Sequence, residues 1–333
     1  MAITPRFAPG GQLGPLWRTA QVFGLLLTVI LLAGLWLYPD TSLRILWYAV
    51  IPVLPAVFLV QPALWRNVCP LATLNLLPGK RSRGLRLDGR IARSAMLVGF
   101  ALLLLLVPAR RFVFNVDGPV LALVIGAVAL LALTLGFVFD RKAGFCNSFC
   151  PVLPVEKLYG QGPLVHVDNV RCADCSLCTA RGCIDLAPRK AVRQAMRLRG
   201  DDPRAWILTG YGAFAAGFPG FVVAYYLIPD TTWAHAGSVY LTIALGSAIS
   251  FVAVAALAFL LRPAARQALP VLGGVTLVLY YWFGATSIAT QWQLGPHVVV
   301  VLRVLAVALV AYWIVRRFNG SPVVPEVARV RGN

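Results

Sequence analysis

The sequence predicts an all-α polytopic membrane protein with about eight transmembrane helices and one small cytoplasmic loop that holds most of its cysteines. Three observations predict this fold class. Hydrophobic residues make up 59% of the 333 residues, charged residues only 13%, and the mean hydropathy is +0.78. Long apolar runs recur along the chain, and basic residues gather in alternate loops between them. This composition is typical of membrane proteins rather than of two soluble domains.

The apolar runs are long enough to cross roughly 30 Å of hydrocarbon. The first follows Arg6 and Arg18, but it is long and lacks a small-residue cleavage site, so we expect a retained helix rather than a secretory signal peptide. The eight predicted spans cover about 20–38, 43–64, 94–109, 119–139, 206–228, 237–260, 269–289 and 298–318.

The basic residues predict the orientation. All 30 Lys and Arg except Arg44, Arg110, Arg111 and Arg303 lie at the two ends of the chain or in alternate loops. By the positive-inside rule, both termini and every cysteine face the cytoplasm, in the inner (cytoplasmic) membrane of a bacterium. The net charge of +18 is not concentrated on one soluble face, so we expect the lipid bilayer, and no nucleic acid, as its partner.

The most informative motif is the stretch from Cys172 through Cys175 and Cys178 to Cys183. Its C-x2-C-x2-C spacing puts three thiolates within seven residues, which is typical of a 4Fe–4S cluster. A structural zinc ion is the alternative, but zinc sites usually take two separated Cys pairs. The seven cysteines are also an odd number in a reducing compartment, which favours metal or redox ligands over disulfides. We therefore expect a small ferredoxin-like iron–sulfur loop.

A repeat predicts a second cysteine group. Residues 67–79 and 148–160 each carry a Cys-Pro pair after a membrane hairpin, which would bring Cys69 near Cys146 and Cys150. Trp65 stands in the first copy where Cys146 stands in the second. Seven thiolates fall one short of the eight that two clusters need, so the chain could bind one cluster or two. Each cluster could take its ligands from one cysteine group, or the two groups could exchange a ligand, as in ferredoxins with crossed ligation. His166 is a candidate substitute ligand.

These features divide the chain into six parts. The parts are a first transmembrane hairpin (1–64), a cytoplasmic basic loop with Cys-Pro (65–93), a second transmembrane hairpin (94–139), a cytoplasmic iron–sulfur module (140–205), a four-helix membrane bundle (206–318) and a cytoplasmic tail (319–333). Within the iron–sulfur module, 164–170 alternates like a short strand and 187–200 reads as a basic helix.

The last four predicted spans contain no cysteine. His235 and His297 near their outer ends, together with Arg303 inside the last span, mark a region for a haem or a quinone. The alternative is that Trp, Tyr and His residues simply favour the membrane boundary and that Arg303 extends to the outer surface. No catalytic constellation is visible, such as a Walker loop, an HExxH motif or a Ser-His-Asp set.

Three motifs, CNSFCP at 146–151, WRNVCP at 65–70 and CADCSLC at 172–178, resemble those of a known family. It is the membrane-bound polyferredoxin family of the NapH and NosR type, with the related cytochrome-oxidase assembly proteins, and the resemblance covers roughly 20–190. The family has two full CxxxCP motifs and two regular ferredoxin motifs. This chain has Trp65 in place of one Cys, a single ferredoxin motif, and Cys183 one residue further along. The resemblance implies 4Fe–4S clusters and electron transfer between the quinone pool and other redox partners.

Three functions follow as hypotheses. The first is an iron–sulfur protein that relays electrons within a respiratory or quinone-linked system, together with other electron-transfer subunits, as a carrier rather than a stand-alone catalyst. The second is a redox regulator or a metallocentre assembly factor that handles copper through Cys69, Cys146 and Cys150, because soft thiolates bind Cu(I) well. The third, a transporter with a zinc loop, is disfavoured because no acidic residue lies inside a span.

Overall fold

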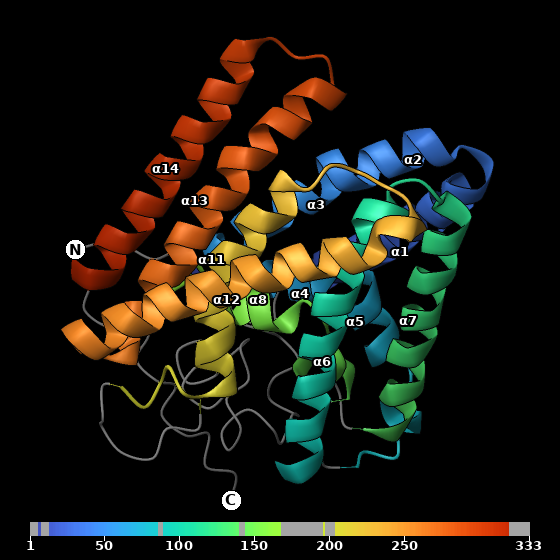
Figure 1. Cartoon of the computed structure of the whole chain (residues 1–333). Helices are drawn as coiled ribbons and strands as arrows, with labels where there is room; N and C mark the ends of the chain where they lie inside the picture. Colours follow the sequence, from blue (N-terminus) through green and yellow to red (C-terminus); the bar gives the residue numbers. More distant parts are fainter. Residues whose placement is uncertain are drawn as a thin grey trace, which may run out of the picture.

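The chain folds into a bundle of helices, as a computed structural model shows (Figure 1). The structure describes residues 6–7, 13–85, 89–139, 144–167, 196 and 204–319. Apart from two two-residue strands, the regular elements of this part are helical. The strands β1 (Arg6–Phe7) and β2 (His166–Val167) pair in parallel, with Arg6 opposite His166. The strand predicted over 164–170 is therefore present at His166–Val167.

The first half of the bundle contains two hairpins of long helices. Asp117 begins the last of these helices by accepting a 2.9 Å hydrogen bond from the amide of Val120. Two of the spans include a π-helical turn, η1 (Leu46–Val50) and η3 (Arg110–Phe114). The long elements are α1 (Leu13–Leu37), α2 (Pro39–Ile45) continued by η1 and α3 (Ile51–Val60), α6 (Gly89–Ala109) continued by η3, and α7 (Gly118–Val138).

Each hairpin is followed by a compact corner made of short elements. Because Pro has no amide hydrogen, it is tolerated at the start of a helix, and Pro70 of the first Cys-Pro pair is the first residue of α5. Pro151 of the second pair lies two residues before α8. The first corner comprises α4 (Pro62–Val68), α5 (Pro70–Leu76) and η2 (Gly79–Arg81). The second comprises η5 (Phe145–Phe149) and α8 (Leu153–Tyr159).

The second half of the bundle consists of α11 (Gly210–Leu227), η7 (Trp233–His235), α12 (Ala236–Leu261), α13 (Ala265–Gln291) and α14 (Pro296–Asn319). α11 packs against α12 and α13, and α13 packs against α14. In Figure 1, α11 stands at the centre and α12 crosses in front of it. Thr209 begins α11 by accepting a hydrogen bond from the amide of Gly212.

Seven helical segments are long and apolar enough to cross a membrane, so the described chain fits a multi-pass membrane protein. They match seven of the eight predicted spans. The eighth, predicted over 206–228, is the helix α11, but it is rich in Gly and Tyr and does not reach the same apolar level. Most of α11 is buried by its neighbours, including Tyr211, Phe218 and Tyr225.

Glycines allow close helix packing in this half. A side chain at Gly220 would collide with the backbone carbonyl of Gly246, where α11 meets α12. A β-carbon at Gly273 would lie 2.9 Å from the carbonyl oxygen of Leu158, where α13 meets α8. Small residues let membrane helices approach each other in this way.

Several predicted features lie outside the described residues. They are the four cysteines from Cys172 to Cys183, the basic helix at 187–200 apart from Met196, and the tail beyond Asn319.

Candidate functional site

The two Cys-Pro corners have the same backbone shape. Cys69 has φ −55° and ψ 126°, and Cys150 has φ −60° and ψ 121°. This conformation is expected because the ring of a following proline disfavours the helical region for the residue before it. In both corners a helical turn therefore ends at the cysteine and a new short helix starts at or just after the proline.

The corners differ in the turn that leads into the cysteine. The amide of Cys69 donates to the carbonyl of Trp65, four residues back, at 2.7 Å. The amide of Cys150 donates to the carbonyl of Phe145, five residues back, at 3.0 Å. The sequence alignment pairs Trp65 with Cys146, but the hydrogen bonds pair Trp65 with Phe145. The second turn thus has one residue more than the first, and Cys146 lies within this π-helical turn, a feature that often occurs at functional sites.

The structure brings Cys69, Cys146 and Cys150 together in one apolar cluster. Cys146 is buried, the other two are partly buried, and none of the three is in a disulfide. The cluster is completed by side chains of α5, α7 and η5, among them Ala72, Ala132 and Phe145. Residues 81 positions apart in the sequence, Cys69 and Cys150, therefore share one environment.

A buried ion pair joins the two corners beside the cysteines. Arg66 Nη1 lies 2.8 Å from Glu156 Oε2, and both side chains are less than 5% exposed. Arg66 also donates to Asn147 Oδ1 at 2.6 Å and to the carbonyl oxygen of Cys146 at 3.3 Å. One arginine of the first corner thus holds three groups of the second. Such a pair is costly to break, because either partner alone would be a buried charge.

Burial sets the protonation of the thiols. It raises the pKa of Cys69 above its usual range, the charge of Glu156 raises it further, and Arg66 acts in the opposite direction. Burial likewise raises the pKa of Cys150, and the neighbouring Cys146 and Glu156 add to this effect. Without a metal these thiols therefore stay protonated near neutral pH. A cation that bound here would have to displace their protons.

The donor set has the chemistry that an iron–sulfur cluster or Cu(I) requires, which is sulfur in an apolar, largely water-free site. Among the described residues, however, no three His, Cys, Asp or Glu side chains converge closely enough to hold a metal ion. Further ligands would have to come from Cys172, Cys175, Cys178 or Cys183, which lie outside the described residues. The backbone of His166 is described, as part of β2.

An apolar groove of about 850 Å³ lies between α6, α11 and α12. Its wall includes a run of aromatic rings, with centroid distances of 5.0 Å between Phe100 and Phe214 and 4.9 Å between Phe214 and Phe218. Phe100, Met96 and Tyr211 also border a smaller hollow against Cys150. The groove and the hollow at Cys150 therefore share part of their walls.

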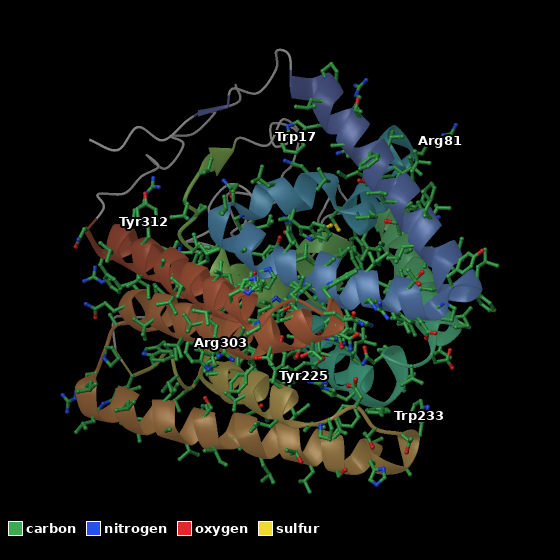
Figure 2. The ribbon with its side chains drawn as sticks, turned by 90° about the horizontal axis from the view of Figure 1, so that it is seen from above. Trp17, Arg81, Tyr225, Trp233, Arg303 and Tyr312 are labelled. Carbon is green, nitrogen blue, oxygen red and sulfur yellow. The ribbon has the colours of Figure 1, made fainter. Side chains whose placement is uncertain are left out.

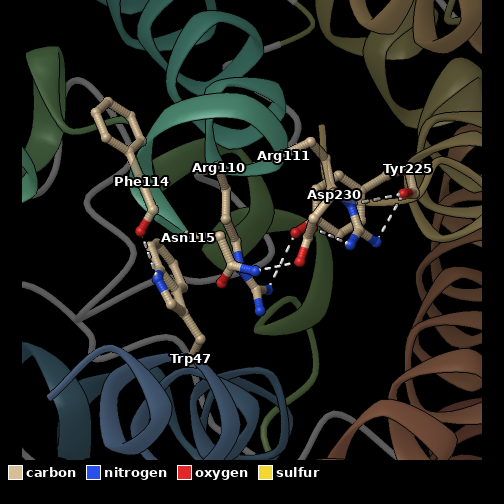
Figure 3. Close-up of polar contacts among 7 residues, drawn as sticks. All are labelled: Trp47, Arg110, Arg111, Phe114, Asn115, Tyr225 and Asp230. Carbon is tan, nitrogen blue, oxygen red and sulfur yellow. Dashed lines mark hydrogen bonds and ion pairs between the residues drawn. The ribbon is translucent and has the colours of Figure 1, made fainter. Parts of the chain in front are cut away.

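A second polar cluster surrounds η3. Its first residue, Arg110, lies eleven residues after Gly99, the residue of α6 that faces the carbonyl oxygen of Cys150. Arg111 pairs with Asp230 at 2.9 Å and donates to the carbonyl oxygen of Tyr225 (Figure 3). Asn115 donates to the other oxygen of Asp230. Arg110 lies with its Cζ 4.5 Å from the ring centre of Trp47. We name Trp47, Tyr48, Arg110, Arg111, Asn115, Tyr225 and Asp230 the arginine cluster.

The structure does not bring His235, His297 and Arg303 into one site with the groove. His235 in η7 and His297 at the start of α14 are exposed. Arg303 donates to the carbonyl oxygen of Trp282 at 2.9 Å and to Thr286 Oγ1 at 3.0 Å, which ties α14 to α13. Figure 2 shows Trp233, two residues before His235, well apart from Arg303.

Sequence reasoning missed Arg66, Glu156 and the arginine cluster. A signal was present for the first two, because Arg66 lies inside WRNVCP and Glu156 is an isolated acid in an apolar stretch directly after CNSFCP. Charged residues within such motifs are expected to be paired when they are buried. For the arginine cluster the signal was the pair Arg110-Arg111, which departs from the loop pattern of the other basic residues.

Compared with models of protein families, with curated proteins and with solved structures, the chain matches none of them. What it does must therefore be argued from its own residues.

Proposed function

We propose that this protein is a membrane-bound iron–sulfur electron-transfer protein of the polyferredoxin type. It relays electrons at the cytoplasmic face of a bacterial inner membrane, as a carrier subunit of a respiratory or quinone-linked redox system. One or two 4Fe–4S clusters, when bound, supply one-electron transfer. Cys172, Cys175, Cys178 and Cys183 are the proposed ligands of the first, and Cys69, Cys146 and Cys150 those of a second site.

The observation that carries the proposal is the meeting of Cys69, Cys146 and Cys150 in one apolar cluster from two separate corners. Arg66 and Glu156 hold the corners together, so the thiols share one cluster before any cofactor is bound. The apolar groove supports a lipid-soluble redox partner such as a quinone, because its wall shares Met96, Phe100 and Tyr211 with the small hollow at Cys150.

Contacts between distant segments support eight crossings. Trp313 donates to the carbonyl oxygen of Gly162, so the end of α14 lies on the same side as the second corner. Two points on the same side of a membrane are separated by an even number of crossings. Between the second corner and the end of α14, the helices α12, α13 and α14 make only three. α11 supplies the fourth, because Trp206 before it bonds to Pro263 and Asp230 after it bonds to Arg111. With the positive-inside rule, both termini and all cysteines would be cytoplasmic.

The test is the iron and acid-labile sulfide content of anaerobically purified protein, with paramagnetic resonance after reduction. About four irons per chain that Cys172→Ser removes and Cys150→Ser leaves would place one cluster on the 172–183 loop. About eight would require the second site as well. Ser176→Ala is the matched control, since it changes the same loop without removing a thiol. Metal-free protein that still transfers electrons would overturn the proposal.

A second candidate function is copper handling by a redox regulator or metallocentre assembly factor. It is favoured by one observation, namely that Cys69, Cys146 and Cys150 lie in one apolar cluster, and soft thiolates bind Cu(I) well. An anaerobic Cu(I) titration distinguishes the two. Stoichiometric binding that Cys69→Ser abolishes, in protein that already holds one cluster, would favour copper. Binding that is unchanged in Cys69→Ser would remove this candidate.

A further inference from the structure

The guanidinium of Arg110 is only partly satisfied by the described chain. Its Nη1 donates to the hydroxyl of Tyr225 at 3.0 Å, and no other hydrogen bond of Arg110 is formed within the described residues. Nε is buried without an acceptor. The rings of Trp47 and Tyr48 lie 4.5 Å and 5.1 Å from Cζ, so aromatic faces provide the remaining contacts. Figure 3 shows Trp47 beside Arg110.

The arginine cluster also carries a surplus of positive charge. It contains Arg110 and Arg111 but a single carboxylate, Asp230, whose two oxygens are already taken by Arg111 and Asn115. An arginine cannot lose its proton in a protein, so Arg110 remains a cation. Cation–π contacts offset only part of the cost of withdrawing that charge from water.

The surroundings hold Arg110 in place but do not enclose it. η1 and η3 are tied together, because Trp47 Nε1 donates to the carbonyl oxygen of Phe114 at 2.9 Å. The neighbouring Arg111 is fixed by Tyr225 and Asp230. Arg110 itself is half-buried and stands at the end of a membrane-crossing segment, Ser94–Phe114, where lipid headgroups and water begin.

From this geometry we propose that Arg110 is the centre of a binding site for one phosphate oxyanion at the membrane boundary. The planar guanidinium suits the oxygens of a phosphate group, and aromatic rings suit the boundary itself. The phosphate comes either from a phospholipid headgroup or from solution, and the chemistry of recognition is the same. This site is independent of the cysteines and of the proposed electron transfer.

The experiment has two arms on purified full-length protein in a maltoside detergent. In one, native mass spectrometry counts phospholipid retained after exposure to phosphatidylglycerol micelles. In the other, inorganic phosphate is titrated while the melting temperature is followed, with chloride at equal ionic strength as the reference. We expect one arm to show a single site in the wild type that Arg110→Gln weakens by about tenfold or more, the loss of one charge-assisted hydrogen bond.

Two variants keep the result interpretable. Arg44→Gln removes an exposed arginine of α2 and should bind like the wild type. Arg110→Lys keeps the charge but loses the planar fork, so it should bind more weakly than the wild type even if Arg110→Gln does not fold. Retained lipid without a phosphate effect identifies the headgroup as the source, and the reverse identifies free phosphate. Binding in neither arm, or unchanged binding in both Arg110 variants, overturns the site.

Discussion

Arg66 is buried and Arg110 is half-buried, and the surroundings of the two side chains differ in kind. Arg66 lies between the two Cys-Pro corners and pairs with Glu156, so its charge is neutralised within the chain. Arg110 begins η3, which continues α6, and lies beside aromatic rings and a tyrosine hydroxyl; no carboxylate pairs with it among the described residues. About 16 Å of helical rise separates it from the level of Cys150.

The difference shows two uses of a buried cation. A closed ion pair fixes the relative position of two segments, and it leaves little capacity for a ligand. A cation held by aromatic faces is positioned but not neutralised, so it remains available to an anion. We therefore expect Arg66 to act on the geometry of the cysteine cluster and Arg110 to act on binding.

The largest effect should come from breaking the closed pair. Glu156→Gln leaves the Arg66 charge buried without its carboxylate, and we expect a loss of about 3–5 kcal/mol in the free energy of unfolding. Denaturant unfolding in detergent measures this loss. The double variant Arg66→Leu with Glu156→Leu should recover most of it, because neither charge then remains. A loss below about 1 kcal/mol for Glu156→Gln would show that the pair does not lock the corners.

Replacing Arg110 should cost less free energy of unfolding than replacing Glu156. Arg110→Gln removes a cation–π contact and one hydrogen bond to Tyr225, for which we expect a loss of about 1–2 kcal/mol in phosphate-free detergent. The same unfolding measurement applies, with exposed Arg44→Gln as the control within about 0.5 kcal/mol of the wild type. If Arg110→Gln cost as much as Glu156→Gln, the contrast between the two arginines would disappear.

The smallest effect concerns the thiols next to Arg66. Their raised pKa means that these thiols in cluster-free protein should react slowly with iodoacetamide at pH 8. The reaction rate should keep rising as the pH is raised beyond the usual pKa of a thiol. Glu156 raises the pKa of both Cys69 and Cys150, whereas Arg66 lowers that of Cys69, so the Arg66→Leu, Glu156→Leu double variant should speed the labelling of Cys150 more than that of Cys69 at the same pH. Mass spectrometry of the labelled peptides measures both rates. Equal labelling rates in the wild type and the double variant would show that the ion pair does not affect the protonation of the cysteines.

The same shift has a consequence for stability. Above about pH 8.5 the thiols of the unfolded chain ionise, while those of the folded chain stay protonated. The unfolded state then binds fewer protons, so stability contributed by these thiols is complete below that pH and is lost as the pH rises further.

The sequence predicted the long helices well, because an apolar run of about twenty residues has few alternatives in a membrane. The runs at 119–139 and 237–260 appear as α7 and α12 with ends shifted by one residue. The repeat also placed Cys69 near Cys146 and Cys150. Local patterns fix these features, since each depends on hydrophobicity or on a proline within a few residues.

Features that depend on distant partners were not predictable in this way. Arg66 and Glu156 are 90 residues apart, and no periodicity links them. The π-helical turns η1, η3 and η5 have no sequence period of their own. α11 was predicted as an apolar span, whereas its tyrosines and glycines serve contacts with α12, α13 and η3. The groove arises from helix packing and leaves no signature in any single segment.

The extra residue in the turn before Cys150 has a consequence for engineering. Replacing Trp65 by cysteine would not copy the second corner into the first, because the backbone places Trp65 where Phe145 stands. To place a fourth thiol as Cys146 is placed, one residue would have to be inserted before Cys69, so that a π-helical turn forms there as it does before Cys150. The difference in cysteine number between the two corners therefore goes together with a difference in chain length.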